Sequence, residues 1–179
     1  MPDFRERGML IRSERASDVA AIAEVHRAAF GQEAEAGLVE RIRAADGFDS
    51  RLSLVAEIDG RVVGHILFSP IWIETDDGRC VDAMALAPMG VRPECQCRGI
   101  GSALVLEGLE VCRWLGHAIV IVVGHAGYYP RFGFERASGL GIRPPFEVPD
   151  ESFMVMGLQA GVLDRARGVV RYSAAFAAL

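Results

Sequence analysis

The sequence predicts an α/β (α+β) fold in which a mixed, mostly antiparallel central sheet is flanked by helices. Two strand-like runs joined by Asp59-Gly60, a strong two-residue hairpin signal, predict its antiparallel half. An apolar run that ends at Val91 leads into a glycine-rich turn and a helical pattern over 100–115. Since a buried aliphatic run follows at 118–123, we expect one parallel crossover in the same sheet.

Hydrophobic periodicity places the other elements in order. Apolar runs bounded by turn residues predict strands over 9–13, 52–58, 61–74, 84–91, 118–123 and 153–158. Apolar residues at helical spacing predict helices that begin at 17–18, surround 38–42 and cover 100–115. A bulge is expected around Ser69-Pro70. The segment 168–176 is expected to be a final strand or an extension, and its residues 169–176 could supply an intersubunit strand in a homodimer.

Composition favours one globular domain over residues 1–179. Hydrophobic residues make up 51% of the chain and charged residues 24%, which excludes a disordered protein. The formal charge is −5 and no basic block occurs, so nucleic acid is not an expected partner. No apolar run is long enough to span a membrane, and residues 1–8 lack the apolar core of a secretory signal. We therefore expect a cytoplasmic protein without a membrane partner.

The segment Gln96-Cys97-Arg98-Gly99-Ile100-Gly101 points most directly to a chemistry. Its glycines let the backbone approach a ligand, and its N–H groups lie at a helix start, where the dipole favours an anion. We therefore expect backbone capture of a phosphate or pyrophosphate. A P-loop is excluded because no Lys follows the glycines. Leu104 stands where the dinucleotide fingerprint needs Gly or Ala, which argues against a dinucleotide site.

This glycine pattern, preceded by a strand that ends at Val91, resembles the GNAT N-acetyltransferase superfamily. In that family the loop holds the pyrophosphate of acetyl-CoA. A second segment, Tyr129-Pro130-Arg131-Phe132-Gly133-Phe134, matches the Tyr-x-x-x-Gly-Phe signature that lies downstream. The resemblance covers roughly residues 9–158 and leaves 159–179 as a C-terminal extension. The segment 124–134 is closest to a bacterial subgroup of small predicted N-acetyltransferases.

The resemblance implies direct transfer of an acetyl group from acetyl-CoA to a primary amine of a small molecule or peptide, in a ternary complex. It also implies two strands that splay apart around the pantetheine arm. By alignment, the Met89 N–H would point at the acetyl carbonyl and stabilise the oxyanion. Tyr129 would be the general acid for the thiolate, since Tyr128 lacks the spacing to the second signature. The cofactor-binding residues implied are Met89, Val91, Gln96, Cys97, Arg98, Gly99, Ile100, Gly101, Ser102, His125 and Tyr129.

The general base is left open. Some family members carry a glutamate where this chain has Ala85, and Asp82, His65 or a water relay are alternatives. His125 stands where the subgroup usually has Asp, which puts the cofactor contact at that position in doubt. The acceptor pocket is expected from the first helix pair, around 30–35, and from the long strand around 65–69.

Metal is not expected. Cys95 and Cys97 lack a partner pair at zinc spacing, so ordinary reduced thiols are the favoured interpretation. Two other functions stay open beside the acetyltransferase. One is a catalytically silent acyl-CoA-binding or regulatory module on the same fold. The other is a nucleotide-binding domain, which would require binding of NAD or ATP where acetyl-CoA fails.

Overall fold

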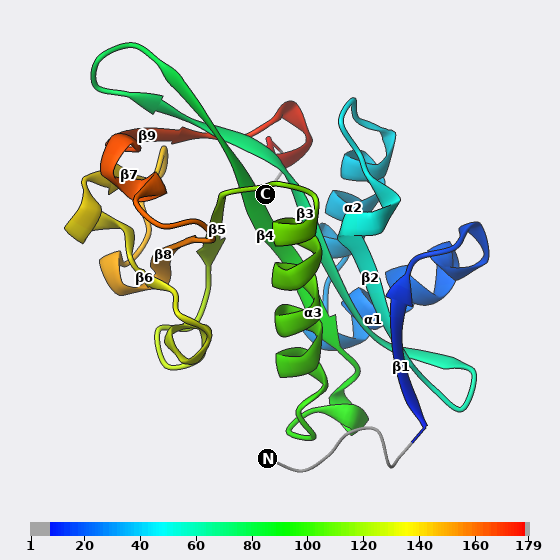
Figure 1. Cartoon of the computed structure of the whole chain (residues 1–179). Coiled ribbons are helices and arrows are strands. Elements are labelled where there is room, and N and C mark those ends of the chain that lie inside the picture. Colours follow the sequence, from blue (N-terminus) through cyan, green and yellow to red (C-terminus); the bar gives the residue numbers. More distant parts are fainter. Residues whose placement is uncertain (1–7, 178–179) are drawn as a thin grey trace.

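A nine-stranded sheet organises residues 8–177, the part of the chain that this computed structural model describes (Figure 1). The strands are β1 (Met9–Ser13), β2 (Ser53–Ile58), β3 (Arg61–Thr75), β4 (Cys80–Val91), β5 (Ile119–Val123), β6 (Glu135–Arg136), β7 (Ile142–Arg143), β8 (Phe153–Gly157) and β9 (Gly168–Arg171). They lie in the order β1-β2-β3-β4-β5-β8-β6, with β9 added to β3 and β7 to β9. Most neighbours are antiparallel, whereas β4–β5 and β7–β9 are parallel.

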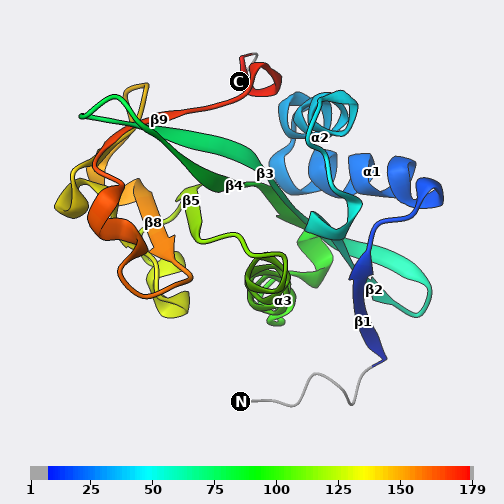
Figure 2. The same ribbon diagram turned by 45° about the horizontal axis from the view of Figure 1, so that its top comes forward.

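Three helices cover the two faces of this sheet. They are α1 (Val19–Phe30), α2 (Ala34–Ala44) and α3 (Ile100–Trp114). Figure 2 shows α1 and α2 on one face and α3 on the other. On the α3 face Leu104 is buried with Phe68, and on the α1–α2 face Ile22 and Leu38 are buried with apolar residues of β2 and β3. The predicted mixed α/β fold with helices on both faces is therefore confirmed.

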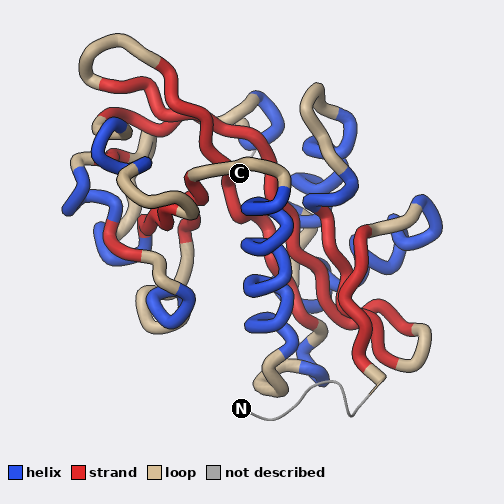
Figure 3. Tube along the Cα trace, in the orientation of Figure 1, coloured by secondary structure: helices blue, strands red, loops and turns tan. Residues whose placement is uncertain are grey.

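The predicted elements are present, and one strand boundary differs clearly. Strand β4 begins at Cys80, four residues before the predicted start. Asp59-Gly60 forms the expected turn, with positive φ angles of 50° and 77°. Figure 3 shows the long hairpin of β3 and β4 at the centre of the sheet. The N-terminal residues 1–7, on which the absence of a leader was argued, lie outside the described residues.

The predicted bulge at Ser69-Pro70 is wrong. These residues pair regularly with Ala85 and Met84, and the irregularity lies between Ile66 and Phe68, where β4 contributes one extra residue. Pro70 fits within β3 although no bulge surrounds it. The pairing of β3 with β2 ends at Leu67 and its pairing with β9 begins at Trp72, so no strand there needs the missing N–H of Pro70.

Strands β4 and β5 separate soon after they meet. They pair only at Met84 with Val120 and at Ala85 with Ile121. Strand β4 then continues to Val91 without a β5 partner. This opening is the splay that the resemblance implied, and it leaves the edges of both strands available to a ligand.

The C-terminal segment pairs with other strands of the same chain. Strand β9 pairs with Trp72–Thr75 of β3 on one edge and with β7 on the other. A 3₁₀ helix, Ala174–Phe176, follows and lies beside α2, where the Arg41 guanidinium donates to the Ala175 carbonyl at 2.8 Å. The expectation that this segment adds a strand to a second subunit is therefore wrong for 168–171. In residues 8–177 we find no helix long and apolar enough to cross a membrane.

Candidate active site

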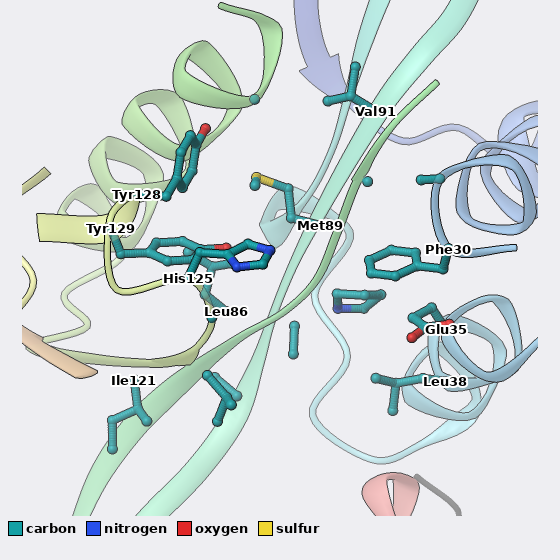
Figure 4. Close-up of a pocket in the computed structure, with 18 of the residues that line it drawn as sticks. Phe30, Glu35, Leu38, Leu86, Met89, Val91, Ile121, His125, Tyr128 and Tyr129 are labelled. Carbon is teal, nitrogen blue, oxygen red and sulfur yellow. The ribbon is translucent and has the colours of Figure 1, made fainter. Parts of the chain in front are cut away.

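A cavity of about 1440 Å³ lies where β4 and β5 separate. Figure 4 shows its two sides, one with Tyr128 and Tyr129 and the other, across β4, with Phe30 and Glu35. We call the first the loop side and the second the helix-pair side. The cavity thus connects the predicted phosphate loop with the predicted acceptor region.

The phosphate loop is shaped by two residues with positive φ, Cys97 at 57° and Gly99 at 80°. Gly99 is the residue that precedes α3, so a side chain there would be strained and the loop would not meet the helix in this way. The Gln96 amide donates to the Val91 carbonyl at 3.0 Å and ties the loop to the end of β4. The loop therefore brings the N-terminus of a fifteen-residue helix to the cavity.

The structure brings almost every predicted site residue to this cavity. The residues that line it include Met89, Val91, Gln96, Cys97, Gly99, Ile100, Gly101, Ser102, His125 and Tyr129. Arg98 is exposed and does not line the cavity. Its predicted cofactor contact is thus the one that the geometry does not support.

Tyr129 lies on the loop side, next to Tyr128. Its ring packs edge-to-face on Tyr128 at 5.1 Å and on Phe134 at 5.7 Å between centroids. A side chain at Gly124 would collide with this ring, because an added Cβ would lie 2.2 Å from it. Burial raises the pKa of Tyr129 well above its ordinary value, so the phenol is protonated at neutral pH.

Tyr128 is a cavity residue that the sequence analysis set aside. Its hydroxyl lies 3.4 Å from the Ser102 hydroxyl, above the start of α3, and the Arg131 guanidinium stacks on its ring at 4.7 Å. His125 begins the turn that carries both tyrosines, since its carbonyl accepts the Tyr128 N–H at 2.9 Å. The two neighbouring phenols therefore face different parts of the cavity.

The helix-pair side is apolar and aromatic. The Tyr172 ring packs in a tilted arrangement against Phe146, at 5.6 Å between centroids, and against Phe176, at 5.0 Å, and all three line the cavity with Phe30. Glu35 is the one acidic residue among the cavity-lining residues of the described chain. The predicted contribution of 30–35 is in place. The predicted contribution of 65–69 is not, because no residue of that range lines the cavity.

The proposed bases fall outside the cavity. Asp82 is exposed and does not line it, whereas Ala85 lines it without a titratable group. His65 is fully buried, and its Nδ1 lies 2.8 Å from Nε2 of His26, which is also fully buried. The sequence did not single out His26.

These two histidines predict acid destabilisation. Burial lowers the pKa of His26 to about 4, and burial with the nearby charges of His26 and Arg43 lowers the pKa of His65 well below its ordinary value. Below about pH 6.5 the unfolded chain binds protons that the native state excludes, so stability falls as the pH falls. His26 alone should contribute a loss of about 3 kcal/mol by pH 4. Thermal unfolding between pH 7.5 and 4 measures this loss. His26→Gln should make the dependence of stability on pH shallower, and a wild-type stability that does not change with pH would contradict the prediction.

A family model described as an acetyltransferase (GNAT) domain matches residues 10–137. The chain belongs to the GNAT acetyltransferases. This GNAT chain is 36% identical over 165 residues to the uncharacterized N-acetyltransferase YhbS of Escherichia coli, covering 92% of this chain and 96% of that protein. It is 40% identical over 136 residues to the uncharacterized N-acetyltransferase YjhQ of Escherichia coli, covering 75% of each.

Solved GNAT structures agree with the fold. The structure of YhbS from Escherichia coli in complex with CoA has a TM-score of 0.85 and 34% identity, covering 94% of this chain and 92% of that one. A GNAT acetyltransferase from Brucella melitensis in complex with acetyl-CoA has a TM-score of 0.77 and 36% identity, covering 95% and 99%. Both similarities span nearly the whole GNAT chain described here.

Among residues 8–177, no three His, Cys, Asp or Glu side chains gather in a way that could hold a metal ion. The four cysteines are free, with Cys95 and Cys112 buried and Cys80 and Cys97 exposed. Cys97 lies in the phosphate loop, where its backbone conformation shapes the turn.

Proposed function

We propose that this protein transfers the acetyl group of acetyl-CoA directly to a primary amine while both substrates are bound. The observation that carries the proposal is the cavity that joins the N-terminus of α3 and a protonated tyrosine on the loop side to a separate apolar side. The similar structures with CoA and acetyl-CoA support the choice of co-substrate. We propose that the unit comprises residues 1–179, and that it acts in the cytoplasm, where its four free thiols would stay reduced.

In this mechanism the position of each residue in the cavity determines its role. The loop N–H groups from Gln96 to Ser102 hold the pyrophosphate, and the unpaired end of β4 holds the pantetheine arm at Val91. The amine attacks the thioester carbon, and the Met89 N–H stabilises the oxygen as it gains charge, an effect of about 3 kcal/mol. The C–S bond then breaks, and the Tyr129 hydroxyl donates to the departing sulfur. Because burial raises the pKa of Tyr129, its main contribution is a hydrogen bond to the developing thiolate rather than a complete early proton transfer.

The helix-pair side indicates the kind of amine. Phe30, Phe146 and Tyr172 offer aromatic surface, and Glu35 offers the carboxylate that would attract an ammonium group. We therefore propose a small-molecule or peptide acceptor that carries its amine on an apolar body. A highly charged polyamine matches this surface less well, because one carboxylate would face several cations.

An acceptor screen tests the proposal. Purified protein is incubated with acetyl-CoA and a panel of amines, and released CoA is followed by thiol detection. We expect turnover with aromatic or aliphatic primary amines at rates at least tenfold above those with polyamines, since unpaired buried charges are costly. Acetyl-CoA binding without turnover on any amine would favour the silent acyl-CoA-binding module. Binding of NAD or ATP in place of acetyl-CoA would favour the nucleotide-binding alternative.

A further inference from the structure

A buried chain of hydrogen bonds runs along the face of the sheet that α1 and α2 cover. His26 Nε2 lies 2.8 Å from His65 Nδ1, and His65 Nε2 lies 2.8 Å from the Ser53 hydroxyl. The Ser53 hydroxyl donates to Glu14 Oε2 at 2.5 Å, and the Arg43 guanidinium donates to both oxygens of Glu14 at 2.8 and 3.0 Å. Four polar side chains are thus linked in one line, with an arginine at its end.

The four hydrogen-bonded residues belong to different elements of the fold. His26 belongs to α1, His65 to β3, Ser53 begins β2, and Glu14 directly follows β1. The first three are fully buried, with no exposed surface. Apolar side chains in these places would avoid the cost of removing polar groups from water, so the chain is not explained by the stability of the core alone.

The charge of Glu14 determines which atom of each hydrogen bond carries the proton. Glu14, held by Arg43, can only accept, so Ser53 donates its O–H to Glu14. The Ser53 oxygen then accepts from His65 Nε2–H, and His65 Nδ1 accepts from His26 Nε2–H. Since a neutral imidazole carries one N–H, His26 Nδ1 is left with a free lone pair. The chain therefore presents a basic nitrogen at the end opposite to Glu14.

That nitrogen lies just behind the cavity wall. His26 Nδ1 is buried without a hydrogen-bond partner among the described residues. A Cβ on Gly90 would lie 3.0 Å from His26 Nδ1, and Ala29 is the other neighbour of that position. Gly90 and Ala29 both line the cavity, and Phe30, which stacks on His26 at 6.0 Å, lines it too. Gly90 also follows Met89, the residue assigned to the acetyl carbonyl.

We propose that this chain is a proton relay that takes the proton released by the attacking amine and delivers it to Glu14 at the edge of the sheet. The inference rests on the proposed acetyltransferase function. The amine N–H bond breaks, and its proton passes through one water molecule to His26 Nδ1. His26 then gives its Nε2 proton to His65 Nδ1, His65 gives its Nε2 proton to Ser53, and Ser53 gives its proton to Glu14. One proton enters and one arrives at Glu14, so no other reactant is needed.

The surroundings suit this role. Within residues 8–177, the titratable or charged side chains hydrogen-bonded in the chain are its own members, His26, His65 and Glu14, with Arg43. Both imidazoles are neutral at pH 7 because burial lowers their pKa values, so they can accept and pass on a proton without first losing one. The side chain of Glu14 is 6% exposed and that of Arg43 is 20% exposed, which gives the proton an exit to solvent.

Two variants cut the relay at its ends. His26→Gln keeps a donor to His65 but cannot pass on a proton, and Glu14→Gln keeps an acceptor for Ser53 but removes the final carboxylate. With an alkylamine identified in the screen, we expect kcat at pH 7 to fall about a hundredfold for His26→Gln and about tenfold for Glu14→Gln, the scale of general base catalysis. The loss should shrink as the pH rises, because hydroxide can then take the released proton directly. The KM for acetyl-CoA should stay unchanged.

Asp18→Asn is the matched control for Glu14→Gln. Asp18 is also a buried acid held by two hydrogen bonds from an arginine, Arg12, at 2.6 and 3.1 Å, but it lies outside the relay. We expect Asp18→Asn to lower the melting temperature without a pH-dependent loss of kcat. His117→Gln controls for the loss of an imidazole outside the relay.

Three results would overturn the relay. Wild-type kcat in both relay variants would overturn it while leaving the acetyltransferase proposal intact. A loss of equal size at every pH, accompanied by weaker acetyl-CoA binding, would assign the chain a purely structural role. An absence of turnover in the wild-type protein would remove the proposed function and the relay together.

Discussion

Tyr129→Phe is expected to lower kcat about a hundredfold, while the apparent KM for acetyl-CoA changes little. The ring of Tyr129 is buried against Tyr128 and Phe134, so phenylalanine keeps this packing and deletes only the hydroxyl. In the proposed mechanism the deleted hydrogen bond acts on the departing sulfur, where charge develops only in the transition state. Steady-state kinetics with an amine from the acceptor screen measures both constants.

Tyr128→Phe is the matched control for this variant. It removes the neighbouring hydroxyl, which lies above the phosphate loop near Ser102. We expect kcat to stay close to that of the wild type. If Tyr129→Phe kept the wild-type rate and Tyr128→Phe lost most of it, Tyr128 would be the general acid. Wild-type rates for both would mean that the thiolate departs without a protein donor.

Gly101→Val is expected to weaken acetyl-CoA binding at least tenfold with the fold kept. The backbone of Gly101 lines the cavity in the first turn of α3. A Cβ there would lie 2.9 Å from the Tyr128 hydroxyl and 3.8 Å from side-chain atoms of Met89 and Val91. Tyr128 can move, but the two methyl groups of valine would still occupy space that a phosphate needs beside the helix N-terminus. Calorimetry with acetyl-CoA measures the affinity.

Gly139→Val controls for the cost of adding a valine side chain. Gly139 is exposed, lies outside the cavity and has no atom within 4 Å of an added Cβ. Its variant should bind acetyl-CoA as the wild type does, and both variants should unfold cooperatively. Unchanged affinity in Gly101→Val would remove the phosphate-loop assignment.

The hydrogen-bonded chain from His26 to Glu14 could not be predicted from the sequence. The sequence offers His65 as a possible base near the acceptor, but in the structure this residue is fully buried and does not line the cavity. His26 carries no signal in the sequence that sets it apart. The two residues are 39 positions apart, and Ser53 and Glu14 are also 39 apart. No local pattern links such residues, because their contacts exist only after β1, β2, β3 and α1 have packed together.

The sequence by itself determined the order of the elements, the hairpin turn at Asp59-Gly60 and the glycine-rich loop before α3. These features depend on backbone conformation and on hydrophobic spacing over a few residues, which each segment carries alone. The tertiary structure decided where β4 and β5 part, which strand β9 joins, and how Phe146, Tyr172 and Phe176 meet Phe30 across the cavity. It also decided the line from His26 to Glu14. These features depend on contacts between segments far apart in the chain, and burial in the assembled core sets their chemistry.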